Sequence, residues 1–270
     1  MKLRIMISVI LIPVMLYIML GLDPIVSVMI VACLCAIATF ELLYNTRLVR
    51  NFRMIAYSMI MSFLIAFWGY YGSPYPMALG GIIVFCALMF AEMLISHGKM
   101  PFSKACICFM AAIVIPYLLS SIGRIMAMEK CRNYILLPFA LAFASDAGAY
   151  FVGVFFGKHK FVPNISPNKT WEGLFGGILT SVLAAVIYGL VLQFAFKMSV
   201  NYWYAIVFGI IGSLAGTFGD LCFSAVKRQT GIKDFGNLIP GHGGVLDRFD
   251  SMIMIAPLVE LLLLMMPVAV

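Results

Sequence analysis

Long apolar runs, separated by short polar stretches, recur along the whole 270-residue chain. A helix needs roughly 20 residues to cross the ~30 Å hydrocarbon core of a bilayer, and nine runs approach that length. None of them alternates in the way that strands of a transmembrane barrel do, so the runs predict helices. The nine predicted spans are residues 5–22, 24–43, 54–72, 77–96, 104–121, 134–156, 172–195, 203–226 and 248–268. The predicted fold class is therefore all-α, a polytopic integral membrane protein with about nine transmembrane helices.

Composition supports this prediction and adds an orientation. The chain is 64% hydrophobic and only 11% charged, which is far from the composition of a water-soluble domain. Its net charge of +7 does not indicate nucleic-acid binding, because no soluble basic domain carries that charge. With the N-terminus inside, 14 of the 18 basic residues fall in inner segments, as the positive-inside rule requires. We expect a multi-pass protein of the inner (cytoplasmic) membrane, with segments 157–171 and 227–247 facing the cytoplasm.

The polar residues divide the chain into two parts. Residues 1–130 are nearly pure apolar spans, about five in number, joined by short loops. Acids within spans, glycines and the long inner segments 157–171 and 227–247 are concentrated after residue 140. We therefore predict an N-terminal transmembrane part, residues 1–130, and a C-terminal catalytic transmembrane part, residues 131–270.

One span carries a polar stripe. At 100° per residue, Ser213, Thr217, Asp220, Ser224 and Lys227 fall within an arc of about 80° on the helix predicted for residues 203–226 and its cytoplasmic extension. A carboxylate inside a membrane span costs several kcal/mol unless it is paired, protonated or bound to a cation. Asp220 is thus a candidate for a functional cavity, and the alternative is a structural ion pair between helices.

A second polar region precedes this helix. Asp146 and Tyr150 are four residues apart and share one face of the span at 134–156. In the segment that follows, Thr170 can cap the next helix, and Lys169 is positioned for contact with a phosphate.

Segment 227–250 gathers cations, glycines and acids directly before the last span. Lys227, Arg228 and Lys233 supply positive charge for a polyanion. Gly241, Gly243 and Gly244 allow the backbone to turn its N–H groups toward phosphate oxygens.

The acids of the same segment suit a metal ion. Asp247 and Asp250 are about one helical turn apart, a spacing that fits hard-cation coordination. His242 has two interpretations, a hydrogen-bonding loop residue or a member of the site, and no catalytic base is required if the attacking group is already ionised. Together these residues predict a site for a metal-bound phosphate ester.

These residues also resemble a known family. The pattern Ser224-x-Val226-Lys227-Arg228, then Lys233-Asp234-x-Gly236, then Ile239-Pro240-x-His242-Gly243-Gly244-Val245-x-Asp247-Arg248-Phe249-Asp250, is similar to the signature of the phosphatidate cytidylyltransferases, also called CDP-diacylglycerol synthases. The segment from Asp146-x-x-Ala149-Tyr150 through residue 173 resembles the other characteristic region of that family.

The resemblance implies transfer of the cytidylyl group from CTP to phosphatidate, with CDP-diacylglycerol and pyrophosphate as products for phospholipid biosynthesis. It implies a Mg²⁺ requirement, with K⁺ as an assisting ion, and Asp220 and Asp247 as the metal ligands. It also implies membrane lipids as partners and is compatible with a homodimer. The residues it assigns to catalysis are Asp220, Lys227, Asp247 and Asp250, and those it assigns to substrate binding are Ser224, Arg228, Lys233, His242, Gly243, Gly244, Arg248, Lys169, Asp146 and Tyr150.

Two other functions remain open at this point. An ion-coupled transporter also has acids in broken helices, but it gives no role to an exposed loop of Lys, Arg and Gly. A related lipid nucleotidyl- or phosphotransferase that uses another lipid phosphate would share the same polar residues, because acyl chains are recognised by apolar walls.

Overall fold

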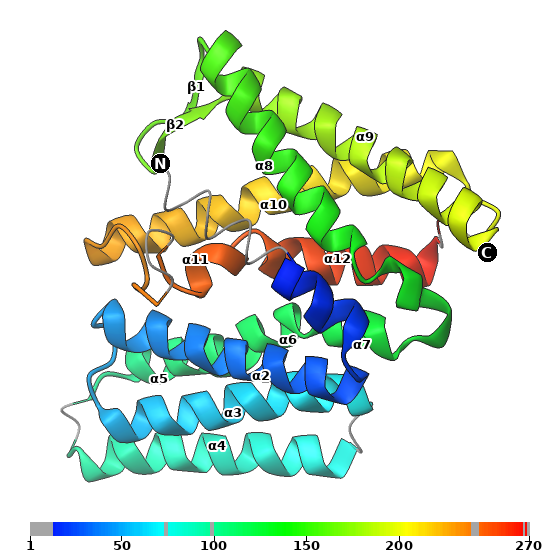
Figure 1. Ribbon diagram of the computed structural model, residues 1–270. Helices are drawn as coiled ribbons and strands as arrows, with labels where there is room; N and C mark the ends of the chain where they lie inside the picture. The colour runs from blue at the N-terminus through cyan, green and yellow to red at the C-terminus, as the bar shows by residue number, and fades with distance from the viewer. Residues whose placement is uncertain (1–12, 73–74, 98–99, 239–242, 267, 269–270) are drawn as a thin grey trace. The chain divides into compact units, whose positions relative to one another are not determined.

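The computed structural model describes residues 13–72, 75–97, 100–238, 243–266 and 268, and most of them are helical (Figure 1). Seven helical stretches of this described part are long and apolar enough to cross a bilayer. They are Pro24–Asn45, Phe52–Tyr71, Pro76–Ile95, Phe102–Ala127, Arg132–Phe156, Trp171–Phe196 and Tyr202–Thr230. The prediction of a polytopic all-α membrane protein is confirmed.

The seven stretches match seven of the nine predicted spans. Residues 5–12 of the first predicted span, 5–22, lie outside the described residues. The described remainder of this span contains the π-helix η1 (Tyr17–Gly21). The ninth is shorter than predicted, because the chain turns at Asp250 and Ser251 between α11 (Leu246–Phe249) and α12 (Met252–Met265). With 14 residues, α12 is about 21 Å long at 1.5 Å per residue.

The chain forms two compact units. The first comprises Met1–Ala127 with Gln229–Phe249, and the second comprises Met128–Arg228 with Asp250–Val270. The signature segment 224–250 therefore contributes residues to both units, and each unit is described separately below.

The first unit is a stack of helices. Its elements are α2 (Pro24–Phe40), η2 (Glu41–Asn45), α3 (Phe52–Tyr71), α4 (Tyr75–Ile95), α5 (Phe102–Phe109), η3 (Met110–Val114), α6 (Ile115–Leu119), α7 (Ser121–Ala127) and α11. Helix α3 packs between α2 and α4 (Figure 1). The local sequence sets the helix ends: the Asp23 side chain accepts from Ile25 N, with Pro24 at the first helical position, and Gly72 ends α3 in the left-handed conformation.

The second unit contains the longest helices. Its elements are η4 (Glu129–Tyr134), α8 (Leu137–Phe156), β1 (Lys160–Val162), β2 (Ser166–Thr170), α9 (Trp171–Phe196), α10 (Tyr202–Thr230) and α12. Small residues allow these helices to approach closely, as is usual in membranes. A Cβ at Gly176 would lie 2.5 Å from the Val152 side chain, and one at Gly212 would lie 2.9 Å from Leu141.

A short hairpin joins α8 and α9. Strands β1 and β2 pair antiparallel, with Lys160 opposite Thr170. The all-α prediction contained no strand in this segment, so the hairpin is a feature that the sequence analysis missed. The predicted cap is confirmed: Thr170 Oγ1 accepts a hydrogen bond of 3.1 Å from Gly173 N and starts α9.

Candidate active site

The polar stripe of α10 forms an ion pair with the hairpin. Lys169 Nζ, near the end of β2, lies 2.5 Å from Asp220 Oδ2 and 3.5 Å from the Thr217 carbonyl oxygen. Ser224 Oγ lies one turn further along α10, 3.5 Å from Asp220 Oδ1. The structural ion pair considered as an alternative for Asp220 is thus present, with Lys169 as the partner. Both side chains remain partly accessible, at 27% and 31% exposure, so the pair is open to a ligand.

A second acid lies close to this pair. Gly219 allows close approach, because a Cβ there would be 2.7 Å from the Asp250 carbonyl oxygen. Asp250 is buried, and its Oδ2 lies 3.8 Å from Lys227 Nζ. Burial, together with the nearby carboxylate of Asp220, raises the pKa of Asp250 to about 7. A cation bound beside these two carboxylates would relieve their repulsion.

A small cavity of about 210 Å³ lies beside the Lys169–Asp220 pair. The second unit alone lines it, with residues of α8, the hairpin, α9 and α10, namely Asp146, Ala149, Tyr150, Phe161, Asn168, Lys169, Thr170, Gly173, Leu174 and Thr217. The structure therefore brings together three of the predicted substrate-binding residues, Asp146, Tyr150 and Lys169. Arg228 is exposed at the end of α10, where its Nε donates to the Ile165 carbonyl in the hairpin turn at 3.2 Å.

In the first unit, Asp247 binds the backbone of the signature loop, which is the part of segment 224–250 between α10 and α11. Its Oδ2 accepts hydrogen bonds from Phe235 N at 2.7 Å and from Gly244 N at 3.0 Å. The carboxylate is buried, and these two N–H donors fix its orientation. The N–H group of Gly244, predicted to face a phosphate, is therefore donated to Asp247.

Steric constraints explain why the loop has glycine at positions 243 and 244. Gly243 adopts a φ of +84°, a conformation that side chains disfavour. A Cβ at Gly244 would collide with the carboxylate of Glu41. Lys233 and Arg248 are exposed, whereas His242 lies outside the described residues.

Sequence analysis missed one acid that holds the same loop. Glu41 is only 3% exposed, and its carboxylate accepts from Val245 N at 3.0 Å and from Leu246 N at 2.8 Å. Asn45 Nδ2, one turn along η2, donates to the Phe235 carbonyl oxygen at 2.6 Å. The sequence did contain an indication of this role, because Glu41 is an acid within an apolar run and such residues usually have a specific partner.

The carboxylates suit a hard cation. Among the residues that the structure describes, no three His, Cys, Asp or Glu side chains form a metal-binding group. Mg²⁺ does not need such a cage, since it commonly binds one or two carboxylates and completes its shell with water and phosphate oxygens. Asp247 in the first unit has an oriented carboxylate, and Asp220 in the second unit has a partly accessible one.

Comparison with known proteins gives consistent results. A family model described as "Cytidylyltransferase family" matches residues 2–266. A phosphatidate cytidylyltransferase of Staphylococcus epidermidis is 39% identical over 189 residues, which is 69% of this chain and 69% of the relative. Proteins of the same name from Staphylococcus haemolyticus and Staphylococcus aureus are 36% and 35% identical, over 70% and 69% of each chain.

Proposed function

The chain belongs to the cytidylyltransferase family, and we propose that it transfers the cytidylyl group of CTP to phosphatidate, forming CDP-diacylglycerol and pyrophosphate. The observation that carries this proposal is the match of the family over residues 2–266, together with relatives named for phosphatidate. The apolar helices support a lipid substrate, because they keep the protein in the membrane where phosphatidate resides.

The reaction needs positioning and charge neutralisation more than proton transfer. A phosphate oxygen of phosphatidate attacks the α-phosphorus of CTP, and the bond from that phosphorus to the pyrophosphate oxygen breaks. The nucleophile is already an anion, so the protein has to align it and stabilise the leaving pyrophosphate. In this proposal Lys227, Arg228 and Lys233 hold phosphate oxygens, and no covalent intermediate with the enzyme forms.

The metal is part of the proposal. Asp220 and Asp247 would hold Mg²⁺, which supplies charge stabilisation on the phosphate oxygens when bound. Asp250 would keep Lys227 in position, since the two side chains lie 3.8 Å apart. The role of K⁺ as an assisting ion remains a prediction, which exchange of K⁺ for Na⁺ in the assay would check. The homodimer also remains a prediction, which the mass of the detergent-solubilised protein would check.

Activity of the purified protein tests this function. Incubation with CTP, phosphatidate and Mg²⁺ should release pyrophosphate and form CDP-diacylglycerol in equal amounts. Other nucleoside triphosphates and other lipid phosphates, offered singly, distinguish this reaction from that of a related lipid transferase. Absence of pyrophosphate release with CTP and phosphatidate would refute the proposal.

Replacing either Lys227 or Lys233 by Ala is expected to lower turnover by at least ~10²-fold. This is the effect of losing one charge-assisted contact of a few kcal/mol in the transition state. Turnover per folded protein is the measurement, with Lys197→Ala, at the far end of α9, as the control that should retain activity. Near-normal turnover in both variants would show that these lysines only add positive charge on the inner side.

We propose that the site opens to the cytoplasm, where both basic segments would face under the positive-inside rule. In a background without native cysteines, single cysteines at Lys160 and Gln229 should react with impermeant thiol reagents only from the inner side. Both positions are exposed. A cysteine at exposed Lys197 should react from outside, and the reverse pattern would contradict this orientation.

A further inference from the structure

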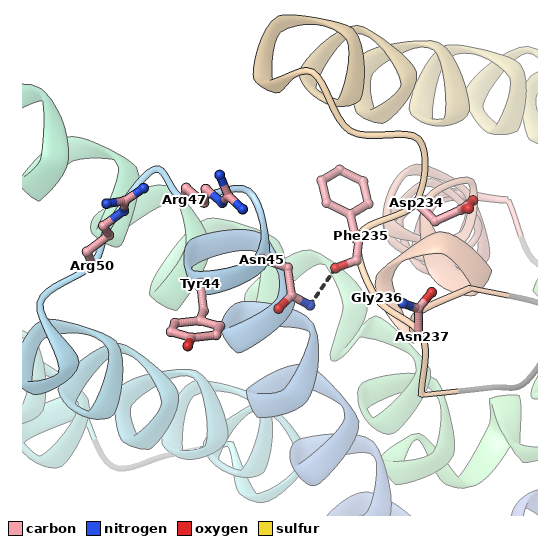
Figure 2. A pocket seen from close by; sticks show the side chains of 8 residues that line it. All are labelled: Tyr44, Asn45, Arg47, Arg50, Asp234, Phe235, Gly236 and Asn237. Atoms are coloured by element: carbon pink, nitrogen blue, oxygen red, sulfur yellow. Dashed lines mark hydrogen bonds between the residues drawn. The ribbon is translucent and has the colours of Figure 1, made fainter.

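The first unit contains a larger cavity, of about 950 Å³, to which the proposed mechanism assigns no role (Figure 2). Two segments far apart in the sequence line it. Segment 44–50 begins in the last two residues of the π-helix η2, and segment 234–237 lies in the signature loop. The lining residues are Tyr44, Asn45, Arg47, Arg50, Asp234, Phe235, Gly236 and Asn237.

The walls of this cavity are fixed in place. Asn45 joins the two segments directly through its 2.6 Å hydrogen bond to the Phe235 carbonyl oxygen, which Figure 2 shows as a dashed line. Phe235 is fully buried, and its N–H is bound to Asp247. The buried carboxylate of Glu41 holds the other end of the loop through Val245 and Leu246. A site with walls held in this way does not have to order a loop when a ligand binds.

The segment with the two arginines has an unusual backbone. Arg47 has a φ of +60°, which is uncommon for a residue with a side chain. The surrounding turn enforces it: Arg47 N donates to the Tyr44 carbonyl oxygen, and Val49, which is fully buried, donates to that of Leu43. The segment begins at a π-helix, and π-helical turns are frequent at functional sites. Such strain persists where the surrounding structure imposes it, and it is concentrated at ligand sites.

Both guanidinium groups are accessible. Arg47 and Arg50 are exposed, and neither side chain has a hydrogen bond or ion pair with any residue that the structure describes. Figure 2 shows them on one side of the cavity, with Asp234 on the opposite side of Phe235. A guanidinium is suited to bidentate binding of phosphate. The positive-inside rule alone would account for two basic residues near the end of a span. It accounts neither for the cavity that they line nor for the left-handed backbone conformation of Arg47.

We propose that Arg47 and Arg50 bind a phosphate group of a substrate in this cavity. The proposal rests on the proposed function, which supplies two substrates with phosphate groups, the CTP triphosphate and the phosphatidate headgroup. The binding chemistry is the same for both. Asp234 belongs to the lining and would face the part of the substrate that carries a bound cation or an N–H donor.

A double variant tests the site with little disturbance of the fold. Arg47→Gly removes the guanidinium and suits the positive φ, and Arg50→Gln removes the second charge while keeping a polar side chain. We expect the double variant to raise KM for CTP or for phosphatidate by about tenfold or more, the effect of losing charge-assisted contacts. Arg47→Lys with Arg50→Lys keeps the charge that guides membrane insertion but loses the planar fork, and its KM should be intermediate. Lys104→Ala, in the same unit but outside the cavity, is the matched control with unchanged KM.

The substrate whose KM rises, either CTP or phosphatidate, is the one whose phosphate group binds Arg47 and Arg50. Unchanged KM values for both substrates in the Gly/Gln double variant would overturn the site while leaving the proposed function intact. If the wild-type protein does not transfer from CTP, the proposed function fails, and binding of inorganic pyrophosphate to purified wild-type and variant protein still tests the site. Weaker binding to the double variant supports it, and equal or absent binding overturns it.

Discussion

Replacing Asp220 or Asp247 by Asn is expected to lower the rate of CDP-diacylglycerol formation by at least ~10³-fold, about 4 kcal/mol in the activation free energy. Asn preserves the shape of the side chain but removes the charge that a divalent cation requires. At position 247 the amide oxygen can still accept from Phe235 N and Gly244 N, so the loop should keep its conformation. At position 220 the change also removes the ion pair with Lys169.

The metal dependence distinguishes a ligand from a structural ion pair. If Asp220 binds Mg²⁺, D220N should require more Mg²⁺ for half-maximal residual activity, whereas Lys169→Met should lower activity without that shift. Wild-type activity should be lost in EDTA and restored by Mg²⁺ or Mn²⁺. Full activity in either Asn variant, or turnover that survives chelation, would contradict the proposed metal site.

Hydropathy was sufficient to locate most of the membrane helices, because a bilayer imposes one length and one polarity on every span. The seven long helices follow the predicted runs closely. The last span was predicted too long, because its apolar run continues through the turn at Asp250 and Ser251, where the backbone leaves the helix before α12. The hairpin was missed because a two-stranded pair of three and five residues has almost no pattern of its own.

The candidate site was predictable wherever its residues share one helix. The stripe on α10 placed Asp220 and Ser224 together, since helical periodicity is visible in the sequence. Contacts between distant segments were not visible. Glu41 and Val245 are separated by 204 positions, and nothing in either local sequence identifies the other as its partner. The division of segment 224–250 between two units was equally hidden, because it depends on tertiary contacts that the local sequence does not show.

Glu41→Ala is the other substitution expected to have a large effect. It would leave the buried N–H groups of Val245 and Leu246 without an acceptor. Two lost hydrogen bonds to a charged group, at about 1.5–3 kcal/mol each, predict a decrease of about 3–6 kcal/mol in the free energy of unfolding of the loop and its helix. The same loop carries Lys233 and leads into Arg248, and a displacement of about 1 Å at reacting groups can cost ~10² in rate. We therefore expect kcat to fall by at least ~10²-fold even at temperatures where the protein is folded.

Glu92→Ala is the matched control, because Glu92 is also a buried acid of the first unit and is bound to Asn51 and Arg53 away from the loop. Both variants should unfold at lower temperature in detergent, but only E41A should speed hydrogen exchange at residues 235–246 and lower kcat per folded protein. Glu41→Gln keeps one carbonyl oxygen for one of the two N–H groups, so its kcat should fall between those of the wild type and E41A. Equal kcat in E41A and E92A would mean that Glu41 contributes only to stability. A difference confined to E41A would show that an acid in the N-terminal half positions the catalytic loop, which accounts for a charged residue within an otherwise apolar span.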